Sequence, residues 1–435
     1  MAQSGPGVRR ILLVATTTGY QIRSFGEAAG ILGVRLVFAS DRCDRLEDPW
    51  WDRAIPVRFH EEARSVDAVV AACRDAPPHG IVAVGDRPAV LAARLAGAFG
   101  LPGHPPEAAA TSRNKLATRR ALQAAGLPTP WFVSMPIEGD ARDLAARVEY
   151  PAVVKPLALS GSRGVVRVDS AIELIAAFDR LRRLLRMRDV RIERDEAHGQ
   201  VLVEGFIPGT EYAIEALLDQ GTLQVLAICD KPDPLDGPFF EETIYRTPSV
   251  APPEVQQRIA SAVRAASAAI GLHHGPVHAE CRISGDTVSM LEVAARPIGG
   301  LCSRALRFVD TRERSTDRST EVVALEEVLL RHALGEDVSS YVRESTASGV
   351  MMIPIPTRGV YRRVDGVDEA ARVAGIEDIR ITAKPDTTLV PLPEGRSYLG
   401  FIFARAATPC AVDRALRDAH ARLRFVIDRE VPVAI

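Results

Sequence analysis

Two glutamates, Glu280 and Glu292, carry the most distinctive chemical pattern in the sequence. They lie in two runs of alternating polarity, typical of half-buried strands, on either side of a three-residue turn predicted at 285–287. The alternation places Leu291 on the apolar face and the two carboxylates opposite each other on the polar face. At roughly 4–5 Å two carboxylates repel by about 4 kcal/mol, which a divalent cation such as Mg²⁺ would relieve.

A cationic clamp follows the second glutamate. Arg296 lies four residues after Glu292, and the pair Gly299–Gly300 then lets backbone N–H groups approach whatever the cation binds. Guanidinium groups and backbone N–H donors both suit phosphate oxygens. The stretch 277–300 therefore predicts a phosphate site with its metal and its charge clamp.

A second candidate phosphate contact is Lys155, which ends the run 150–155 and precedes a small-residue loop. The backbone N–H groups of such a loop can enclose phosphates while the ammonium neutralises them. The loop is not a P-loop, because it lacks GxxxxGK[ST], and a flexible turn after an edge strand explains it equally well. Its residues are Ser160, Gly161, Ser162, Arg163 and Gly164.

The connector Glu204–Ile207 is a third candidate contact. It joins two apolar runs, and its backbone N–H and C=O groups can read an adenine edge. Glu211 follows a few residues later and can reach ribose hydroxyls. Pro208-Gly209 is also typical of an ordinary turn, so the segment alone has two explanations.

The bulk composition is that of an ordinary globular protein. The chain has 435 residues, 47% hydrophobic and 25% charged, which is enough for two or three domains. A formal net charge of −2 argues against nucleic acid or a membrane as the main partner. Six scattered cysteines indicate free thiols. With no signal-peptide pattern and no apolar run near 20 residues, we expect a cytoplasmic protein.

The N-terminal elements predict an open parallel sheet. Three apolar runs alternate with two helical patterns, which is typical of βαβ units with ligand space at the strand ends. Thr16–Gly19 and 85–87 fall at such ends, where either substrate binding or a simple glycine turn accounts for them. A GxGxxG fingerprint is missing after the first run, so a dinucleotide site is not supported. The runs are 9–15, 35–39 and 80–84, and the helices 24–32 and 66–76.

The later elements predict two further units. The proline-rich stretch 101–106 indicates a domain edge, and we predict an α/β and α+β multidomain chain. Its domains are 1–112, 113–345 with a lid at about 150–208, and 346–435. The expected helices are 253–270, 321–332 and 411–424, and the expected strands of the last unit are 349–354, 359–364, 379–381 and 397–404.

These pieces, in this order, resemble the ATP-grasp superfamily over essentially the whole chain. The closing motif EVAARPIGG (292–300), with NKLATRRALQAAGLPTP (114–130) and SYLGFIFA (397–404), looks most like the carboxylate–amine ligases that join amino acids. Biotin carboxylase is a more distant relative. The resemblance implies an ATP-grasp fold with an N-terminal Rossmann-like (pre-ATP-grasp) domain and a C-terminal mixed α/β domain.

The resemblance also implies residue roles. Lys115 and Lys155 would hold ATP phosphates, and the 160–164 loop would close over the β- and γ-phosphates. Adenine contacts would come from Glu204, Phe206 and Ile207, with Glu211 near the ribose.

The metal and catalytic roles follow in the same way. Glu280 and Glu292 would ligate Mg²⁺, with Mn²⁺ as an alternative. Arg296, together with Lys155, would neutralise charge on the transferring phosphoryl group. Ala294 stands where many family members carry an Asn metal ligand, so the expected metal shell is thinner.

The expected reaction converts a carboxylate into an acyl phosphate, which an amine then attacks. We expect small-molecule substrates, an amino acid or related carboxylate plus an amine, and a homodimer as the candidate assembly. The predicted substrate residues are Glu242 for an amino group, Arg304 for a carboxylate, and Tyr245, His278, Gly299 and Gly300. A hydrogen-bonded strand histidine and a surface salt bridge are the alternatives for His278 and Arg304.

Two alternative functions fit the same motifs. One is a biotin-carboxylase-like or formate-using ATP-grasp enzyme. The other is an ATP-binding regulatory protein without turnover, against which the retained Lys155, Glu280, Glu292 and Arg296 argue.

Overall fold

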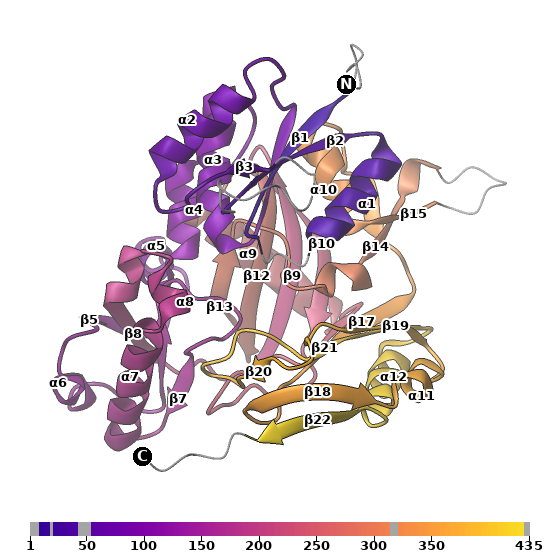
Figure 1. Ribbon diagram of the computed structural model, residues 1–435. Coiled ribbons are helices and arrows are strands. Elements are labelled where there is room, and N and C mark those ends of the chain that lie inside the picture. The colour runs from indigo at the N-terminus through magenta and orange to yellow at the C-terminus, as the bar shows by residue number, and fades with distance from the viewer. Residues whose placement is uncertain (1–7, 18–20, 42–53, 314–320, 430–435) are drawn as a thin grey trace.

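The computed structural model describes residues 8–17, 21–41, 54–313 and 321–429 (Figure 1). Within these ranges no helix combines the length and the apolar character that crossing a membrane requires. The described chain forms mixed α/β layers around one large central sheet.

The N-terminal unit is the predicted open parallel sheet, which confirms that expectation. Its strand order is β3-β2-β1-β4, with every pair parallel. Thr16 follows β1 and Asp86 follows β4, so both lie at the carboxyl edge of the sheet. The elements are β1 (Arg10–Ala15), α1 (Ile22–Leu32), β2 (Arg35–Ser40), β3 (Ile55–Pro56), α2 (Glu62–Ala72), β4 (Gly80–Val84) and α3 (Asp86–Phe99).

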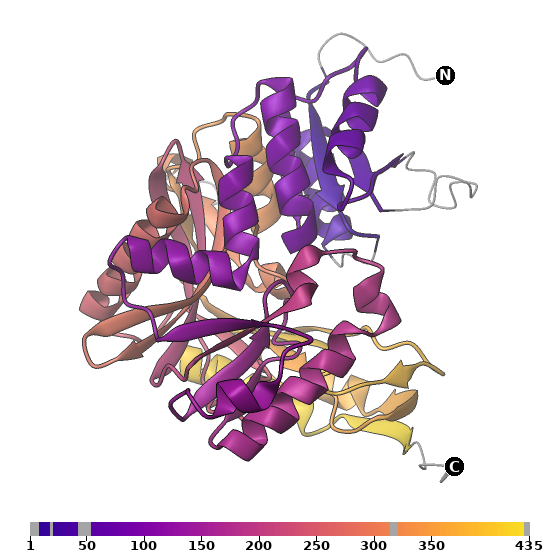
Figure 2. The ribbon, with the colours of Figure 1, turned by 90° about the vertical axis from the view of Figure 1, so that its left-hand side faces the viewer.

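Two short helices lead from this unit to a four-stranded antiparallel lid sheet of order β5-β8-β6-β7. Helix α7 covers one face of the lid sheet (Figure 2). Leu174 and Phe178 of this helix are fully buried in one core with Val154. The elements are α4 (Pro106–Arg113), α5 (Lys115–Ala124), β5 (Phe132–Pro136), α6 (Ala141–Ala145), β6 (Ala152–Pro156), β7 (Val166–Val168), α7 (Ala171–Leu185), α8 (Arg188–Arg191), η1 (Glu196–Gly199) and β8 (Gln200–Gly205).

The central sheet has eight strands, in the order β13-β12-β9-β10-β11-β17-β21-β19. Both faces are buried over β9: Ile214 packs in one core with Ile259 of α9, and Ala213 packs in a second core with Leu329 of α10. The strands are β9 (Thr210–Asp219), β10 (Thr222–Asp230), β11 (Ile244–Thr247), β12 (Gly275–Ser284), β13 (Thr287–Ala294), β17 (Ala347–Ile353), β19 (Ile376–Ile381) and β21 (Gly400–Ala406).

The remaining elements flank this sheet. Helix α9 (Pro253–Ile270) has the predicted bounds and ends at Gly271 in the left-handed conformation. Two small sheets, of order β15-β14-β16 and β20-β18-β22, complete the described chain. The elements are η2 (Cys302–Ala305), β14 (Arg307–Asp310), η3 (Thr311–Glu313), β15 (Val322–Ala324), α10 (Leu325–Ala333), β16 (Tyr341–Arg343), β18 (Gly359–Asp365), α11 (Val367–Ala371), β20 (Thr388–Leu389), α12 (Pro409–His420) and β22 (Arg424–Arg429).

For two helices, one predicted end differs from the structure by about four residues. The β-branched pair in Val322–Ala324 forms β15, so the helix predicted at 321–332 begins only at Leu325. The helix predicted at 411–424 ends at His420, because Arg424 already pairs with Asp365 as the first residue of β22. In both cases tertiary strand pairing outweighs the helical periodicity of a few terminal residues.

Candidate active site

A cavity of about 1020 Å³ lies where the units meet. The N-terminal sheet supplies Thr17 and Asp86 from its carboxyl edge, and the lid supplies Lys155. The central sheet supplies Glu280 and Phe401. Phe401 lies in β21, within residues 346–429, which we call the C-terminal segment. Of the predicted segment Thr16–Gly19, residues 18 and 19 lie outside the described residues, whereas Thr16 and Thr17 line the cavity.

The hairpin β12–β13 brings the two predicted glutamates together. Glu280 pairs directly with Glu292, as the alternation predicted, but the route differs. The turn has two residues, because Ser284 pairs with Thr287, and a β-bulge at Leu291 restores the register. The expectation that Leu291 faces the core was therefore wrong: the bulge turns it into the cavity lining, and Met290 takes the core position.

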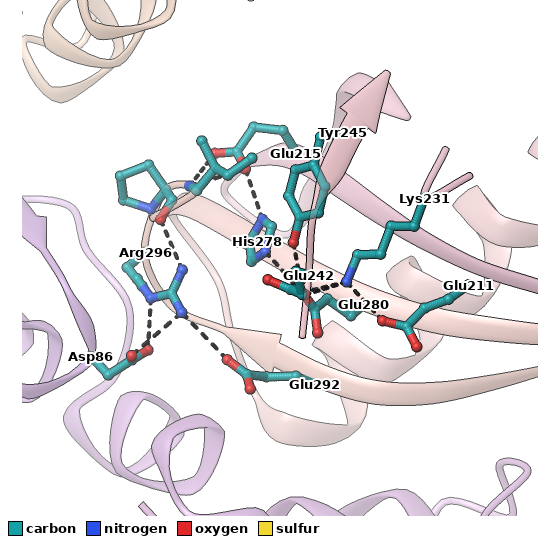
Figure 3. A network of polar contacts seen from close by, with 12 residues as sticks. Asp86, Glu211, Glu215, Lys231, Glu242, Tyr245, His278, Glu280, Glu292 and Arg296 are labelled. Carbon is teal, nitrogen blue, oxygen red and sulfur yellow. Dashed lines mark hydrogen bonds and ion pairs between the residues drawn. The ribbon is translucent and has the colours of Figure 1, made fainter. Parts of the chain in front are cut away.

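Glu280 accepts several contacts on one oxygen. Its Oε1 lies 2.9 Å from Lys231 Nζ, 3.2 Å from Tyr245 Oη and 3.7 Å from His278 Nε2 (Figure 3). Although burial opposes it, the Lys231 ammonium lowers the pKa of Glu280 well below its ordinary value. Glu280 is therefore ionised, as a carboxylate ligand of a cation must be.

Glu292 and Arg296 share an ion network with the N-terminal unit. Arg296 donates from Nε to Asp86 Oδ1 at 2.7 Å, and its Nη2 lies 3.4 Å from Glu292 Oε1 (Figure 3). Lys115 Nζ lies 3.8 Å from the other Glu292 oxygen. Although burial opposes both shifts, the mutual ion pair lowers the pKa of Asp86 and raises that of Arg296. Both groups are therefore charged at neutral pH.

These residues fit a hard divalent cation. Glu280 and Glu292 face each other in the cavity wall, and carboxylate oxygens are the ligands that Mg²⁺ prefers. Ala294 is buried and its methyl group offers no ligand atom.

A second group of potential ligands, Asp219, His274 and His332, involves the far end of β9. The two imidazole rings are stacked, with centroids 4.2 Å apart and planes at 23°. Ring nitrogens bind metals in the plane of the ring, so stacked rings do not direct their lone pairs to one point. We therefore place the metal at the hairpin.

Lys155 lines the cavity from β6 of the lid sheet. Its Nζ lies 2.5 Å from Glu204 Oε1, and Arg119 holds the same carboxylate with two contacts of 2.8 and 3.1 Å. Burial lowers the pKa of Lys155 to about 8, against the attraction of Glu204. Although burial opposes it, Arg119 and Lys155 lower the pKa of Glu204 to about 2. The Glu204 carboxylate thus orients Lys155, while the Glu204 backbone lies within β8, paired with β5 and β6.

Lys115 begins helix α5, whose N-cap Asn114 accepts hydrogen bonds from Leu116 and Ala117. Its Nζ donates to Leu159 O at 2.8 Å, and the side chain lines the cavity between Lys155 and Glu292. The cavity wall therefore holds two ammonium groups, that of Lys115 beside Glu292 and that of Lys155 beside Glu204.

The predicted phosphate loop lies at the same wall. Ser160, Gly161 and Ser162 line the cavity, and Gly161 and Ser162 have φ of 62° and 54°. Gly164 lies behind the loop, where its N–H donates to Pro393 O at 2.8 Å. Arg163 donates from Nε to Glu394 O at 2.9 Å, so the loop is tied to the C-terminal segment.

The predicted adenine end is aromatic and cationic. Phe206 lies 6.4 Å from Phe240 and 5.1 Å from the Arg282 guanidinium. Arg282 also donates to Ile207 O at 2.7 Å and to Glu211 Oε2 at 2.8 Å. Glu211 Oε1 accepts from Lys231 at 2.7 Å, so both Glu211 oxygens already have protein partners.

Most predicted substrate residues line the cavity, namely Glu242, Tyr245, His278, Gly299 and Gly300. Arg304 does not, which corrects its predicted role. It lies on the short helix η2, pairs with Asp378 at 3.2 Å and stacks over Phe403 at 5.4 Å. Its neighbour Cys302 faces the cavity instead, because residues on a tight turn point in different directions.

His278 is held by a glutamate that sequence reasoning missed. Its Nδ1 lies 3.1 Å from Glu215 Oε2, directly across the β9–β12 pair, and Glu215 also accepts the Ile298 N–H at 3.1 Å. Although burial opposes it, hydrogen bonds to Glu215 and Glu280 raise the pKa of His278 to about 9. A charge inside the apolar run 213–218 was the available signal for Glu215. Arg119, Lys231 and Arg282 were missed as well, whereas Asp86 lies in the predicted segment 85–87, which lines the cavity.

Comparison with known proteins identifies three consecutive domain models. Residues 26–103 match an ATP-grasp N-terminal domain, 148–305 an ATP-grasp domain, and 351–428 an L-amino acid ligase C-terminal domain 2. The crystal structure of an L-amino acid ligase from Bacillus licheniformis superposes with a TM-score of 0.79 at 27% identity, covering 97% of this chain and 99% of that one.

Curated relatives match over shorter spans. The D-alanine–D-alanine ligase of Ralstonia pickettii is 32% identical over 40% of this chain, and carnosine synthase 1 of Gallus gallus is 30% identical over 57%. The chain covers 51% and 27% of the lengths of these two relatives. With the cavity geometry and the three domain models together, the chain belongs to the ATP-grasp superfamily and carries a C-terminal domain of the L-amino acid ligase type.

Proposed function

We propose that the protein is an ATP- and Mg²⁺-dependent ligase that joins an amino-acid carboxylate to an amine, the best candidate being a second amino acid, and releases ADP and phosphate. The observation that carries this proposal is one cavity that brings Glu280 and Glu292 together with Lys115 and Lys155, with Arg296 between the hairpin and the N-terminal sheet. The L-amino acid ligase match at 351–428 supports the choice of substrates.

The residues divide the work of phosphoryl transfer between two walls. Lys115 and Lys155 bind the nucleotide phosphates, and the loop at 160–164 covers them. Glu280 and Glu292 would hold a magnesium ion, which when bound would supply positive charge to the phosphate oxygens. Arg296 is charged and pre-oriented by Asp86, so it stabilises the negative charge that develops as the carboxylate oxygen attacks phosphorus.

The amine substrate binds on the central sheet. Glu242 offers a carboxylate to an ammonium group, Tyr245 and His278 border it, and Gly299–Gly300 leave room for a side chain. The ammonium group loses a proton to solvent, and the amine nitrogen then attacks the acyl carbon. Phosphate leaves with the bonding electron pair and takes up the N–H proton that the new amide releases. Water would destroy the acyl phosphate, so the lid contacts with the C-terminal segment keep the intermediate enclosed.

The decisive experiment is phosphate release from ATP and Mg²⁺ across a matrix of paired amino acids and amines. We expect ADP, phosphate and an amide product in equal amounts, and only in wells that contain both a carboxylate and an amine. AMP and pyrophosphate as products would contradict the proposal. Turnover with bicarbonate plus biotin or with formate instead would support the alternative enzymes, and no turnover in any well would support a regulatory ATP-binding protein.

A further inference from the structure

Lys231, which was not among the predicted site residues, contacts three carboxylates of the site. Lys231 directly follows β10, and its side chain is 3% exposed. Its Nζ contacts three carboxylates at once: Glu211 Oε1 at 2.7 Å, Glu242 Oε1 at 2.5 Å and Glu280 Oε1 at 2.9 Å (Figure 3). We call Glu211, Glu242 and Glu280 the carboxylate cage.

The cage separates Lys231 from the cavity. All three glutamates line the cavity, whereas Lys231 is not among the described residues that do so. Lys231 therefore does not reach a substrate or a nucleotide in this arrangement. Any effect on the reaction must pass through the carboxylates that it holds, one of which is the metal-facing Glu280.

The cage has the geometry of a cation site. One oxygen of each glutamate lies within 4.8 Å of the others, close enough for a single metal ion to hold all three. Three carboxylates this close together, one buried and two part-buried, repel each other unless a cation is present. In this protein the cation is the chain's own ammonium group.

The residue type is informative because this chain rarely uses lysine. Of 54 basic residues only four are lysines, and three of them, Lys115, Lys155 and Lys231, lie at this site. The fourth, Lys384, is exposed. An ammonium is a compact charge with three N–H donors, which matches three converging oxygens, whereas a planar guanidinium does not.

We propose that Lys231 is a positioning residue that fills the carboxylate cage as its resident cation and keeps divalent metal out of it. Glu280 and Glu242 are thereby held through their Oε1 atoms, which both contact the Lys231 ammonium. The metal is confined to the Glu280–Glu292 face, next to the phosphates. The placement of the metal at Glu280 and Glu292 rests on the proposed function. The placement of the Lys231 ammonium in the carboxylate cage does not.

The test counts Mn²⁺ ions bound per chain without nucleotide or substrate, by electron paramagnetic resonance of the free ion. We expect Lys231→Met to bind one more Mn²⁺ than the wild type, because the emptied cage accepts the metal. Adding Glu242→Gln to that variant should remove the extra ion. Lys384→Met, the same change at the exposed lysine, should match the wild type.

Two results would overturn the proposal: an unchanged Mn²⁺ count in Lys231→Met, or an extra ion that persists after Glu242→Gln. If Lys231→Met does not fold, Lys231→Gln, which keeps hydrogen bonding but removes the charge, is measured in its place with the same expected gain of one ion. The count uses no turnover, so it decides the role of Lys231 even if the ligase reaction fails in the substrate matrix.

Discussion

Arg296 is oriented before any ligand binds. Its guanidinium donates from Nε to Asp86 at 2.7 Å and from Nη1 to the Pro297 carbonyl at 3.1 Å. Its Nη2 lies 3.4 Å from Glu292. A charge that is already fixed stabilises a transition state without reorganisation, which is why such groups give large catalytic effects. The partner Asp86 comes from the first turn of α3, 210 residues earlier in the chain.

We therefore expect Arg296→Ala to lower kcat by roughly 10²–10³-fold, the range found for lost transition-state donors, while ATP still binds. The measurement is the rate of ADP release at saturating substrates, with ATP affinity measured separately. Arg304→Ala is the matched control, because Arg304 lies outside the cavity and pairs with Asp378. Equal rates in the two variants would remove the proposed role of Arg296.

A second residue-scale prediction concerns the pH dependence of ATP binding. Burial lowers the pKa of Lys155 to about 8, so the free protein loses this ammonium as pH rises through 8. Bound phosphates retain the proton, and the Kd for ATP should therefore rise by up to roughly tenfold per pH unit above 8. Lys155→Arg keeps its charge over this range and should show no inflection. Calorimetric titration between pH 6.5 and 9.5 without the other substrates measures this, and a flat wild-type profile would contradict the assignment.

The residues of the site differ in how well the sequence reveals them. Glu280 and Glu292 could be predicted because strand alternation is a local pattern. The turn is one residue shorter than predicted, but the extra residue in the bulge at Leu291 compensates, so the two glutamates still pair. Asp86, Lys231 and Glu215 act through partners on other elements, and long-range contacts leave no periodic pattern.

At the scale of elements, the phosphate loop depends on glycines that differ in their surroundings. Gly161 has φ of 62° and a Cβ there would meet nothing within 4 Å. Gly164 has φ of 76°, but a Cβ would lie 2.9 Å from Leu184 and 3.0 Å from Leu181 of α7. The loop is thus free on its cavity side and packed on its lid side.

Both substitutions by alanine should be destabilising, but unequally. Gly161→Ala costs about 1 kcal/mol for the left-handed backbone, and Gly164→Ala adds roughly 1–3 kcal/mol of overpacking against α7. Urea denaturation of the two variants and the wild type measures the difference. Equal loss of stability in both variants would show that the loop does not pack on α7 as described.

Regular elements were more predictable than the sheet they build. The bounds of α9 and the parallel βαβ character of the N-terminal unit follow from periodicity and element order. The path of the eight-stranded sheet does not, because β11 pairs with β17 across about 100 intervening residues. This pairing joins the central strands to the C-terminal segment, so the sheet is continuous across the predicted boundary between 345 and 346.

At the scale of the whole molecule, the C-terminal segment completes the cavity and holds the lid. Tyr398 and Phe401 line the cavity, while Pro393 and Glu394 bind the lid through backbone carbonyls. The Glu394 side chain also forms a two-contact ion pair with Arg180 of α7. Lid and C-terminal segment therefore meet directly at the phosphate loop.

Loosening this contact should uncouple phosphate release from amide formation. Glu394→Ala removes the partner of Arg180 and leaves the cavity residues unchanged, so the acyl phosphate should form but meet water more often. Because the pair is part-exposed, we expect a modest effect, roughly a two- to fivefold rise in phosphate released per amide formed. Glu138→Ala, which removes an exposed arginine partner within the lid itself, is the control and should leave the ratio unchanged. Measuring phosphate and amide in the same reaction gives the ratio directly, and a ratio that stays at one in Glu394→Ala would show that the C-terminal segment does not seal the lid.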